Sequence, residues 1–229
     1  MDRNYSVTIV TLCCNKFNLT NDFLSDLMRE KENIDEIIVV DNGSDEETVG
    51  GLEWWRTSSE LPVKVKRFDE NLGFTMGSNI GLRLATENRQ AERRIIFLIS
   101  NDVQISGKFI QQTADILFDP KRSLVGAKLL THDTGWNTFD GTVFPYLEGY
   151  FIAATVDGWI DLNYFDENYA PFDYEDVDLS ATARKKGYKL VPLNNPYIHH
   201  VGGGTLGYNP ERENITRRNR EYFRKKWTE

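Results

Sequence analysis

Four carboxylates fall within six residues in the second half of the chain. They are Asp173, Glu175, Asp176 and Asp178, and apolar residues lie between them. A carboxylate that such neighbours partly bury has a raised proton affinity, which suits a general base acting on a hydroxyl. The same acids can instead stabilise the start of a helix through its dipole. The segment therefore predicts a catalytic carboxylate, with a plain helix start as the alternative.

Asp102 and His200 are the candidate metal ligands. Asp102 follows an apolar segment that ends at Ile99, and a carboxylate at a strand end can hold a divalent cation together with diphosphate oxygens. A neutral imidazole is a common metal ligand, and the glycines after His200 let the backbone approach a phosphate closely. The ordinary alternatives are a turn cap for Asp102 and a packed or surface position for His200. We expect the two to form one site, completed by substrate oxygens and water.

The elements that must position these residues alternate between strand and helix in the first 120 residues. Apolar, β-branched runs predict strands over 7–12, 37–40, 62–68 and 94–99, and helical spacing predicts helices over 23–28, 73–86 and 109–117. Strand–helix units of this length indicate a mostly parallel sheet with right-handed crossovers. The third strand, with alternating lysines, is expected at an edge or rim.

Polar residues follow all four predicted strands. Because ligands of open α/β sheets bind beyond the carboxyl ends of the strands, these loops are candidate binding residues. Turn chemistry alone favours the same residue types in any single loop. The candidates are Cys13–Asn15, Asp41–Ser44, Asp69–Asn71 and Ser100–Asp102.

After residue 120 the pattern is less regular. It predicts an aromatic strand over 142–156, a short helix over 176–186, a flexible loop at Gly202–Gly204 and a basic final helix over 212–227. No repeat or linker divides the chain, so we expect one domain over residues 1–229.

Composition excludes several classes of protein. The 229 residues include 27 Lys+Arg and 35 Asp+Glu, a net charge of −8, with 40% hydrophobic residues. A disordered chain is excluded by the apolar content, and the acidity predicts no nucleic-acid partner. No apolar run approaches the roughly 20 residues of a spanning helix. The only cysteines, Cys13 and Cys14, are adjacent and predict no disulfide, so a cytoplasmic location is expected.

Six motifs in order resemble family-2 glycosyltransferases of the GT-A fold, especially the rhamnosyltransferase-like branch. They are TIVTLCCNK (8–16), VVDNGSDEET (39–48), NLGFTMGSNIGL (71–82), FLISNDV (97–103), YFDENYAPFDYEDVDL (164–179) and HVGGGT (200–205). The resemblance implies a Rossmann-like, mostly parallel sheet flanked by helices. It implies a nucleotide-binding half over 1–120 and an irregular acceptor half over 121–229.

The resemblance also implies an activity and residue roles. The activity is transfer of a sugar from a UDP-, GDP- or dTDP-linked donor to a hydroxyl of a glycan or lipid-linked acceptor, with inversion. Asp176, paired with Glu175, is the implied base, and Asp102 and His200 are the implied ligands of Mn²⁺ or Mg²⁺. Ser100 departs from the family, which often has a second Asp or Asn there. The implied nucleotide-binding set is Thr11, Cys13, Asn15, Asp41, Asp69, Asn71, Gly73, Asn79 and Asn101.

The acceptor side is less constrained by sequence. Trp136, Tyr150 and Trp159, with Tyr146, are candidates for stacking on an acceptor sugar, and core packing is the alternative for each. The basic final helix predicts either peripheral contact with an anionic membrane or a solvated helix whose aromatic residues pack on the body. Two other functions stay open: a non-catalytic nucleotide-sugar-binding module and a sugar-phosphate nucleotidyltransferase. The second requires a glycine-rich loop after the first strand, which is absent here.

Overall fold

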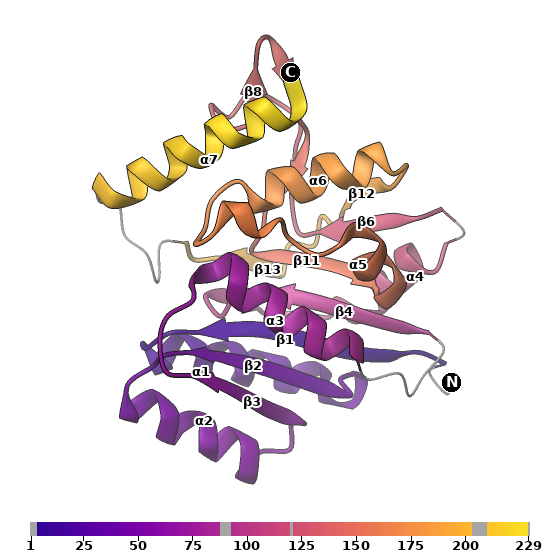
Figure 1. The fold of residues 1–229 in the computed structure, drawn as a ribbon. Helices are drawn as coiled ribbons and strands as arrows, with labels where there is room; N and C mark the ends of the chain where they lie inside the picture. The colour runs from indigo at the N-terminus through magenta and orange to yellow at the C-terminus, as the bar shows by residue number, and fades with distance from the viewer. Residues whose placement is uncertain (1–3, 88–92, 120, 203–209, 229) are drawn as a thin grey trace.

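A seven-stranded sheet runs through the computed structural model, which describes residues 4–87, 93–119, 121–202 and 210–228 (Figure 1). Its strands, in spatial order, are β12 (Lys189–Pro192), β6 (Ser123–Gly126), β11 (Phe151–Thr155), β4 (Arg94–Ile99), β1 (Ser6–Cys13), β2 (Glu36–Asn42) and β3 (Val63–Phe68). Only β11 runs antiparallel to its neighbours, β4 and β6. The predicted mostly parallel sheet, with the third strand at its edge, is therefore confirmed, and both halves of the chain contribute to it.

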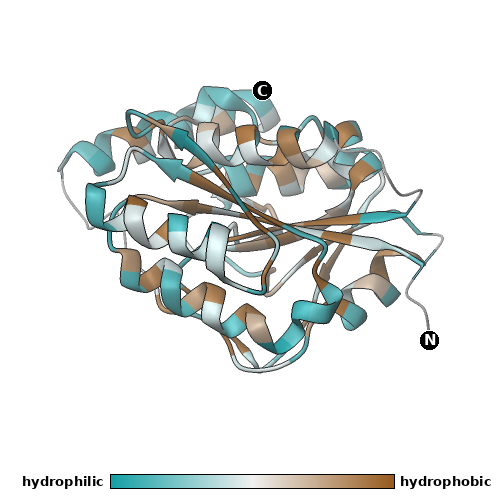
Figure 2. Ribbon diagram, turned by 90° about the horizontal axis from the view of Figure 1, so that it is seen from below, coloured by the Kyte–Doolittle hydropathy of each residue, from teal (hydrophilic) through white to brown (hydrophobic). Residues whose placement is uncertain are grey.

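The central strands are buried on both faces, so their alternate residues serve two different cores. Ile37 and Val39 belong to the core that contains residues of α1 (Phe17–Leu27), α2 (Glu46–Ser58) and α4 (Ile110–Leu117). Ile38 and Val40 belong to the core under α3 (Gly73–Glu87), α5 (Val156–Leu162) and α6 (Glu175–Lys185). Figure 2 shows the strands mostly hydrophobic, with hydrophilic residues mainly on the surrounding helices.

A third, smaller core joins the outer side of α6 to the last helix, α7 (Pro210–Thr228). Val177 and Ala181 of α6 pack there with Phe223 of α7 and with Phe139 of a hairpin, β8 (Thr138–Phe139) and β9 (Thr142–Val143). Figure 1 accordingly shows α7 outside α6. No helix in the described ranges combines the length and apolar character needed to cross a membrane.

Short elements complete the fold. They are the 3₁₀ helices η1 (Met28–Asn33) and η2 (Glu167–Tyr169), and the strands β5 (Val103–Ile105), β7 (Leu129–Leu130), β10 (Tyr146–Leu147) and β13 (Ile198–His200). The strand predicted over 142–156 is in fact three strands, β9, β10 and β11, because Pro145 and a turn at 148–150 interrupt it. In the predicted glycine loop, Gly203 and Gly204 lie outside the described residues.

Helix α2 was not predicted from the sequence. It contains Gly50 and Gly51, which lower helix propensity. Gly51 lies directly against the Phe17 ring, where a Cβ would meet ring carbons at 2.2 Å, so the glycine permits α1 and α2 to approach. One residue of the sequence does indicate the start of this helix. It is Asp45, whose carboxylate accepts a hydrogen bond from the Thr48 N–H at 2.9 Å and caps the helix.

Candidate active site

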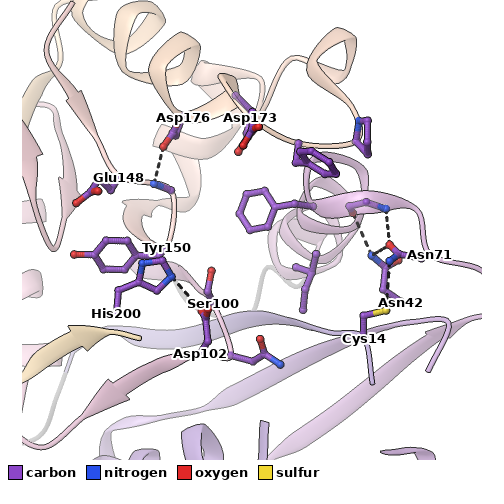
Figure 3. Close-up of a pocket in the computed structure, with 18 of the residues that line it drawn as sticks. Cys14, Asn42, Asn71, Ser100, Asp102, Glu148, Tyr150, Asp173, Asp176 and His200 are labelled. Atoms are coloured by element: carbon purple, nitrogen blue, oxygen red, sulfur yellow. Dashed lines mark hydrogen bonds and ion pairs between the residues drawn. The ribbon is translucent and has the colours of Figure 1, made fainter. Parts of the chain in front are cut away.

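A cavity of about 540 Å³ opens at the carboxyl ends of β1 and β4. These two strands are neighbours, yet the chain leaves β1 toward β2 and reaches β4 later, so the cavity lies at the switch point where α/β sheets bind ligands. Figure 3 shows three groups of polar side chains. Asp173 and Asp176 lie at the start of α6, Asp102 and His200 lie beside the β5–β13 pair, and Cys14, Asn42 and Asn71 lie at the ends of β1, β2 and β3.

Asp102 and His200 form one wall of the cavity. His200 ends β13, which pairs antiparallel with β5, so that His200 lies opposite Val103 in register. The Nε2 atom of His200 lies 3.3 Å from Oδ1 of Asp102, and its ring stacks on Tyr150 with centroids 4.3 Å apart. The structure thus brings together the two predicted metal ligands and fixes the imidazole plane.

Asp176 lies on the opposite wall, in the first turn of α6. Its Oδ2 accepts a hydrogen bond from the Gly149 N–H at 2.9 Å, and its Oδ1 accepts one from the Val177 N–H at 2.8 Å. Burial raises the pKa of Asp176 to about 6, although these two N–H groups oppose the rise. The carboxylate is therefore held in a fixed orientation and is a stronger base than an ordinary aspartate.

Glu175 is the more deeply buried member of the pair, at 6% exposure. Burial and then the neighbouring Asp176 carboxylate raise the pKa of Glu175 well above its ordinary value. Its Oε2 atom is buried and accepts or donates no hydrogen bond within the described residues. A neutral carboxyl that lines the cavity can supply both a donor and an acceptor to a bound hydroxyl.

Amide side chains form the third group. Asn42, the last residue of β2, donates from Nδ2 to Oδ1 of Asn71 at 3.1 Å and to the Gly73 carbonyl at 3.2 Å, and it accepts from the Leu72 N–H at 3.0 Å. Asn71 also donates to the Cys14 sulfur at 3.3 Å. These contacts fasten the loop after β3 to the ends of β1 and β2.

Asp41, predicted to contact the nucleotide, does not line this cavity. It is 1% exposed, and it accepts hydrogen bonds from the Ser44 N–H at 3.1 Å and from Arg67 at 3.3 Å. The next residue, Asn42, lines the cavity instead. The alternation of side chains along a strand could have indicated this difference. Asn42 lies on the same face of β2 as Ile38 and Val40, which is the α3 side of the sheet.

The other predicted residues divide into two groups. Those that line the cavity are Cys13, Asn71, Gly73, Asn101, Asp102, Tyr146, Tyr150, Glu175, Asp176 and His200. Those that do not are Thr11, Asn15, Asp41, Asp69, Asn79, Trp136 and Trp159. Asn79 instead fastens α3 to residue 165, through the Phe165 N–H at 3.0 Å and the Phe165 carbonyl at 2.9 Å.

Several lining residues were not singled out as site residues from the sequence. They are Leu12, Phe74, Glu148, Gly149, Pro171, Phe172 and Arg212. Cys14, Asn42, Ser100 and Asp173 also line the cavity, and they belong to the candidate loops and the acidic segment named above. Glu148, Gly149 and Arg212 lie outside all six motifs, and only the tertiary fold places them here.

Trp159 is a core residue and does not form an acceptor platform in this structure. It is 0% exposed, and its Nε1 donates to the Ile96 carbonyl at 3.0 Å. Trp159→Ala is expected to lower the free energy of unfolding by about 3–5 kcal/mol, since it empties a large buried volume. Urea unfolding measures this. Trp54→Ala is the matched control: Trp54 is 55% exposed, and we expect a change of about 1 kcal/mol or less. Equal effects would contradict the assignment.

The Asp102–His200 pair fits a divalent cation of the Mn²⁺ or Mg²⁺ kind. It offers one carboxylate and one imidazole at the cavity wall, and both groups are acceptable ligands for Mn²⁺. The described part of the chain holds no group of three or more His, Cys, Asp or Glu that could bind a metal alone. The remaining ligands would therefore come from the substrate and water, as expected for a cation that binds together with a diphosphate.

Comparison with known sequences gives a family match and distant relatives. The family model described as "Glycosyl transferase family 2" matches residues 8–165. "Uncharacterized protein Rv1525" of Mycobacterium tuberculosis is 25% identical over 203 residues, covering 81% of this chain and 70% of its own. "Uncharacterized protein Mb1552" of Mycobacterium bovis matches equally well.

Solved structures share the fold. Mannosyltransferase PcManGT from Pyrobaculum calidifontis, in complex with GDP-Man and Mn²⁺, has a TM-score of 0.59 at 20% identity, over 81% of this chain and 54% of its own. S. aureus TarS 1–349 in complex with UDP has a TM-score of 0.63 at 16% identity, over 95% of this chain and 64% of its own. The chain thus spans less than two-thirds of either structure. The predicted GT-A fold is confirmed.

Proposed function

The chain belongs to glycosyl transferase family 2, and we propose that it transfers a sugar from a nucleoside diphosphate sugar to an acceptor hydroxyl with inversion at the anomeric carbon. One observation carries the proposal. A single cavity at the sheet's switch point has a raised-pKa carboxylate, Asp176, on one wall and the Asp102–His200 pair on the other. We further propose that residues 1–229 act as one catalytic unit, because both halves line this cavity.

The nucleotide is proposed to bind on the side of the amide cluster. Asn42, Asn71 and Gly73 lie at the ends of β2 and β3 next to Cys14, where side-chain and backbone groups can hydrogen-bond a base and a ribose. The bound nucleotides of the two structural relatives, GDP-Man and UDP, support this class of donor. The similarity to the rhamnosyltransferase branch stays a prediction.

In the proposed step, the acceptor oxygen attacks the anomeric carbon of the donor. The bond between that carbon and the diphosphate oxygen breaks, and the nucleoside diphosphate leaves with the electron pair. The hydroxyl proton passes to the carboxylate of Asp176, whose orientation is held by the Gly149 and Val177 N–H groups. A base on one wall and a diphosphate on the other give in-line displacement, and hence inversion.

The charges of the cavity support the proposal that a cation binds there. Five carboxyl groups line it, and the one guanidinium among the lining residues, that of Arg212, is paired with Asp173 at 3.0 Å. The five carboxyl groups are those of Asp102, Glu148, Asp173, Glu175 and Asp176. A divalent cation held by Asp102 and His200 would act as a Lewis acid on the leaving diphosphate. Residues Asp102 and His200 would thereby hold the diphosphate on the wall opposite Asp176.

The activity is expected to rise with pH through about 6. Asp176 can accept a proton only when ionised, and burial raises its pKa to about 6, so protonation below that pH removes the base. The acid limb of kcat/KM against pH reports this group in the free enzyme. A limb near the ordinary aspartate value, with full activity at pH 5, would contradict the assignment of Asp176.

The acceptor is proposed to be a glycan, free or lipid-linked, at a cytoplasmic membrane surface. Tyr222, Phe223 and Trp227 of α7 pack with residues of the body in the third core, so they are not available for insertion into a bilayer. Arg217, Arg220 and Lys225 remain exposed and can attract anionic lipid electrostatically. Flotation with anionic and neutral vesicles tests this; equal binding to both, or binding insensitive to salt, would contradict it.

Incubation with UDP-, GDP- and dTDP-sugars, including a dTDP-linked deoxysugar, in the presence of Mn²⁺ or Mg²⁺ tests the proposed function. Release of nucleoside diphosphate that depends on Asp176 and on the cation supports it. Binding without any release would favour the non-catalytic module, and no binding of any donor would overturn both functions. Hydrolysis and transfer are separated by the appearance of a glycosylated acceptor.

A further inference from the structure

The loop that leads into α6 has an unusual backbone. Asp173 and Tyr174 are consecutive non-glycine residues with φ of 71° and 77°, in the left-handed region that such residues rarely adopt. Glu175 and Asp176 follow immediately. A segment in this conformation keeps it only when its surroundings hold it, and the orientation of the carboxylate pair depends on it.

Helix α7 supplies those surroundings through one buried amide. Asn219 is 0% exposed. Its Nδ2 donates to three carbonyl oxygens of the loop, those of Tyr169 at 2.7 Å, Phe172 at 2.8 Å and Asp173 at 2.8 Å. Two N–H bonds serve three acceptors, so one hydrogen is shared. Its Oδ1 accepts from Nε of Arg218 at 3.0 Å, which sets the rotamer of the amide.

Two further residues of α7 hold the side chain of Asp173. Thr216 donates from Oγ1 to Oδ2 of Asp173 at 2.6 Å, and Arg212 donates to Oδ1 at 3.0 Å. Arg218 also donates to the Ala170 carbonyl. Helix α7 therefore holds both ends of the loop 170–174, with Arg218 at Ala170 and with Thr216 and Arg212 at Asp173. The buried Asn219 holds the backbone carbonyls of the same loop.

The same loop forms part of the donor side of the cavity. The Pro171 carbonyl accepts from the Thr75 N–H at 3.0 Å at the start of α3, and Gly73 lies so close to Pro171 that a Cβ would be 2.4 Å from its Cβ. A displacement of the loop would thus move Asp176 relative to the α3 wall.

We propose that Asn219 is a positioning residue for the transfer reaction, which acts by fixing the loop 170–174 and through it the Glu175–Asp176 pair. The inference rests on the proposed function. It assigns to the last helix a role in catalysis that does not require any contact between α7 and the donor.

Asn219→Leu, which keeps the volume and removes the hydrogen bonds, tests the proposal, with Asn214→Ala as the matched control. Asn214 is exposed on the same helix, and its side-chain oxygen accepts a hydrogen bond from Arg217 at 2.9 Å. We expect kcat to fall by about 10²-fold for Asn219→Leu, since a displacement of about 1 Å has that effect. The nucleoside diphosphate Kd should change much less than kcat, because Asn42 and Asn71 are held by hydrogen bonds that do not involve the loop 170–174.

A pH profile distinguishes positioning from loss of folded protein. Loosening the loop admits water to Asp176, so the acid limb of kcat/KM should move to lower pH, whereas partial unfolding leaves the limb in place. The titratable groups that face Asp176 or its partner are Tyr146, Glu148, Asp173, Tyr174, Glu175 and Arg212.

Thr216→Val is the second variant, because Asn219→Leu can fail to fold. It removes one hydrogen bond to Asp173 from a partly exposed position and should lower kcat by about 10-fold or less, in the same direction. If the wild type transfers sugar and every variant that folds, Thr216→Val alone included, keeps kcat and the acid limb unchanged, the inference is overturned. If the wild type transfers from no donor, the proposed function fails instead.

Discussion

Asp176→Asn is expected to lower kcat by about 10²–10⁴-fold, the usual contribution of a general base. Asparagine has nearly the same shape and can still accept one of the two backbone hydrogen bonds, from Gly149 or from Val177. It cannot accept a proton from the acceptor hydroxyl. The effect should therefore appear in kcat, measured by product formation at saturating donor, while the donor KM changes little.

Asp157→Asn provides the control for this substitution. Asp157 is an exposed aspartate in the first turn of α5, so its replacement removes one negative charge without touching the cavity. We expect its kcat to match the wild type within about twofold. If Asp176→Asn transfers sugar as fast as the wild type while binding the donor normally, Asp176 is not the base.

Asp102→Ala is expected to lower kcat/KM by about 10²–10³-fold, since loss of a cation that stabilises a leaving group removes several kcal/mol from the transition state. Binding gives an independent measurement. Calorimetric titration with a nucleoside diphosphate should show affinity that rises with Mn²⁺ for the wild type and does not rise for Asp102→Ala. In the wild type, a chelator should reproduce the effect of the substitution.

His200→Ala should act in the same direction by a smaller factor, and its neighbour supplies the control. His199 is exposed, while His200 lines the cavity beside Asp102. His199→Ala is therefore expected to keep Mn²⁺-dependent nucleotide binding. Binding that is independent of Mn²⁺ and Mg²⁺ in the wild type, with full turnover in a chelator, would exclude a metal role for this pair.

The net charge of −8 is consistent with an anionic donor once the acids are located. The cavity concentrates carboxylates that we propose serve a cation and an acceptor hydroxyl, whereas many of the basic residues lie on α7. Several of those basic side chains are engaged with the body: Lys226 donates to Asp166 at 2.7 Å and to Asp178 at 3.0 Å. The charge is thus divided between an acidic cavity and an outer helix that is basic on its exposed side.

Local properties of the sequence determined the sheet and the set of loops. Short runs that are apolar and rich in β-branched residues favour buried strands. In a parallel sheet, the polar residues that follow such strands gather at one edge. Asn71, Asn101 and Asp102, which follow β3 and β4, accordingly line the cavity. The order of the six motifs added the family, which the match over residues 8–165 bears out.

Only the tertiary structure decided which of these residues face one another. His200 meets Asp102 because β13 pairs with β5. Strand alternation places Asn42 and Asp41 on opposite faces of β2, but the tertiary structure decides that the face of Asn42 is the one that meets the cavity. Asn219 has no sequence signature at all, since an asparagine within a polar helix predicts only a solvated position. Contacts between segments far apart in the chain depend on packing and register, and periodicity within a single segment does not encode them.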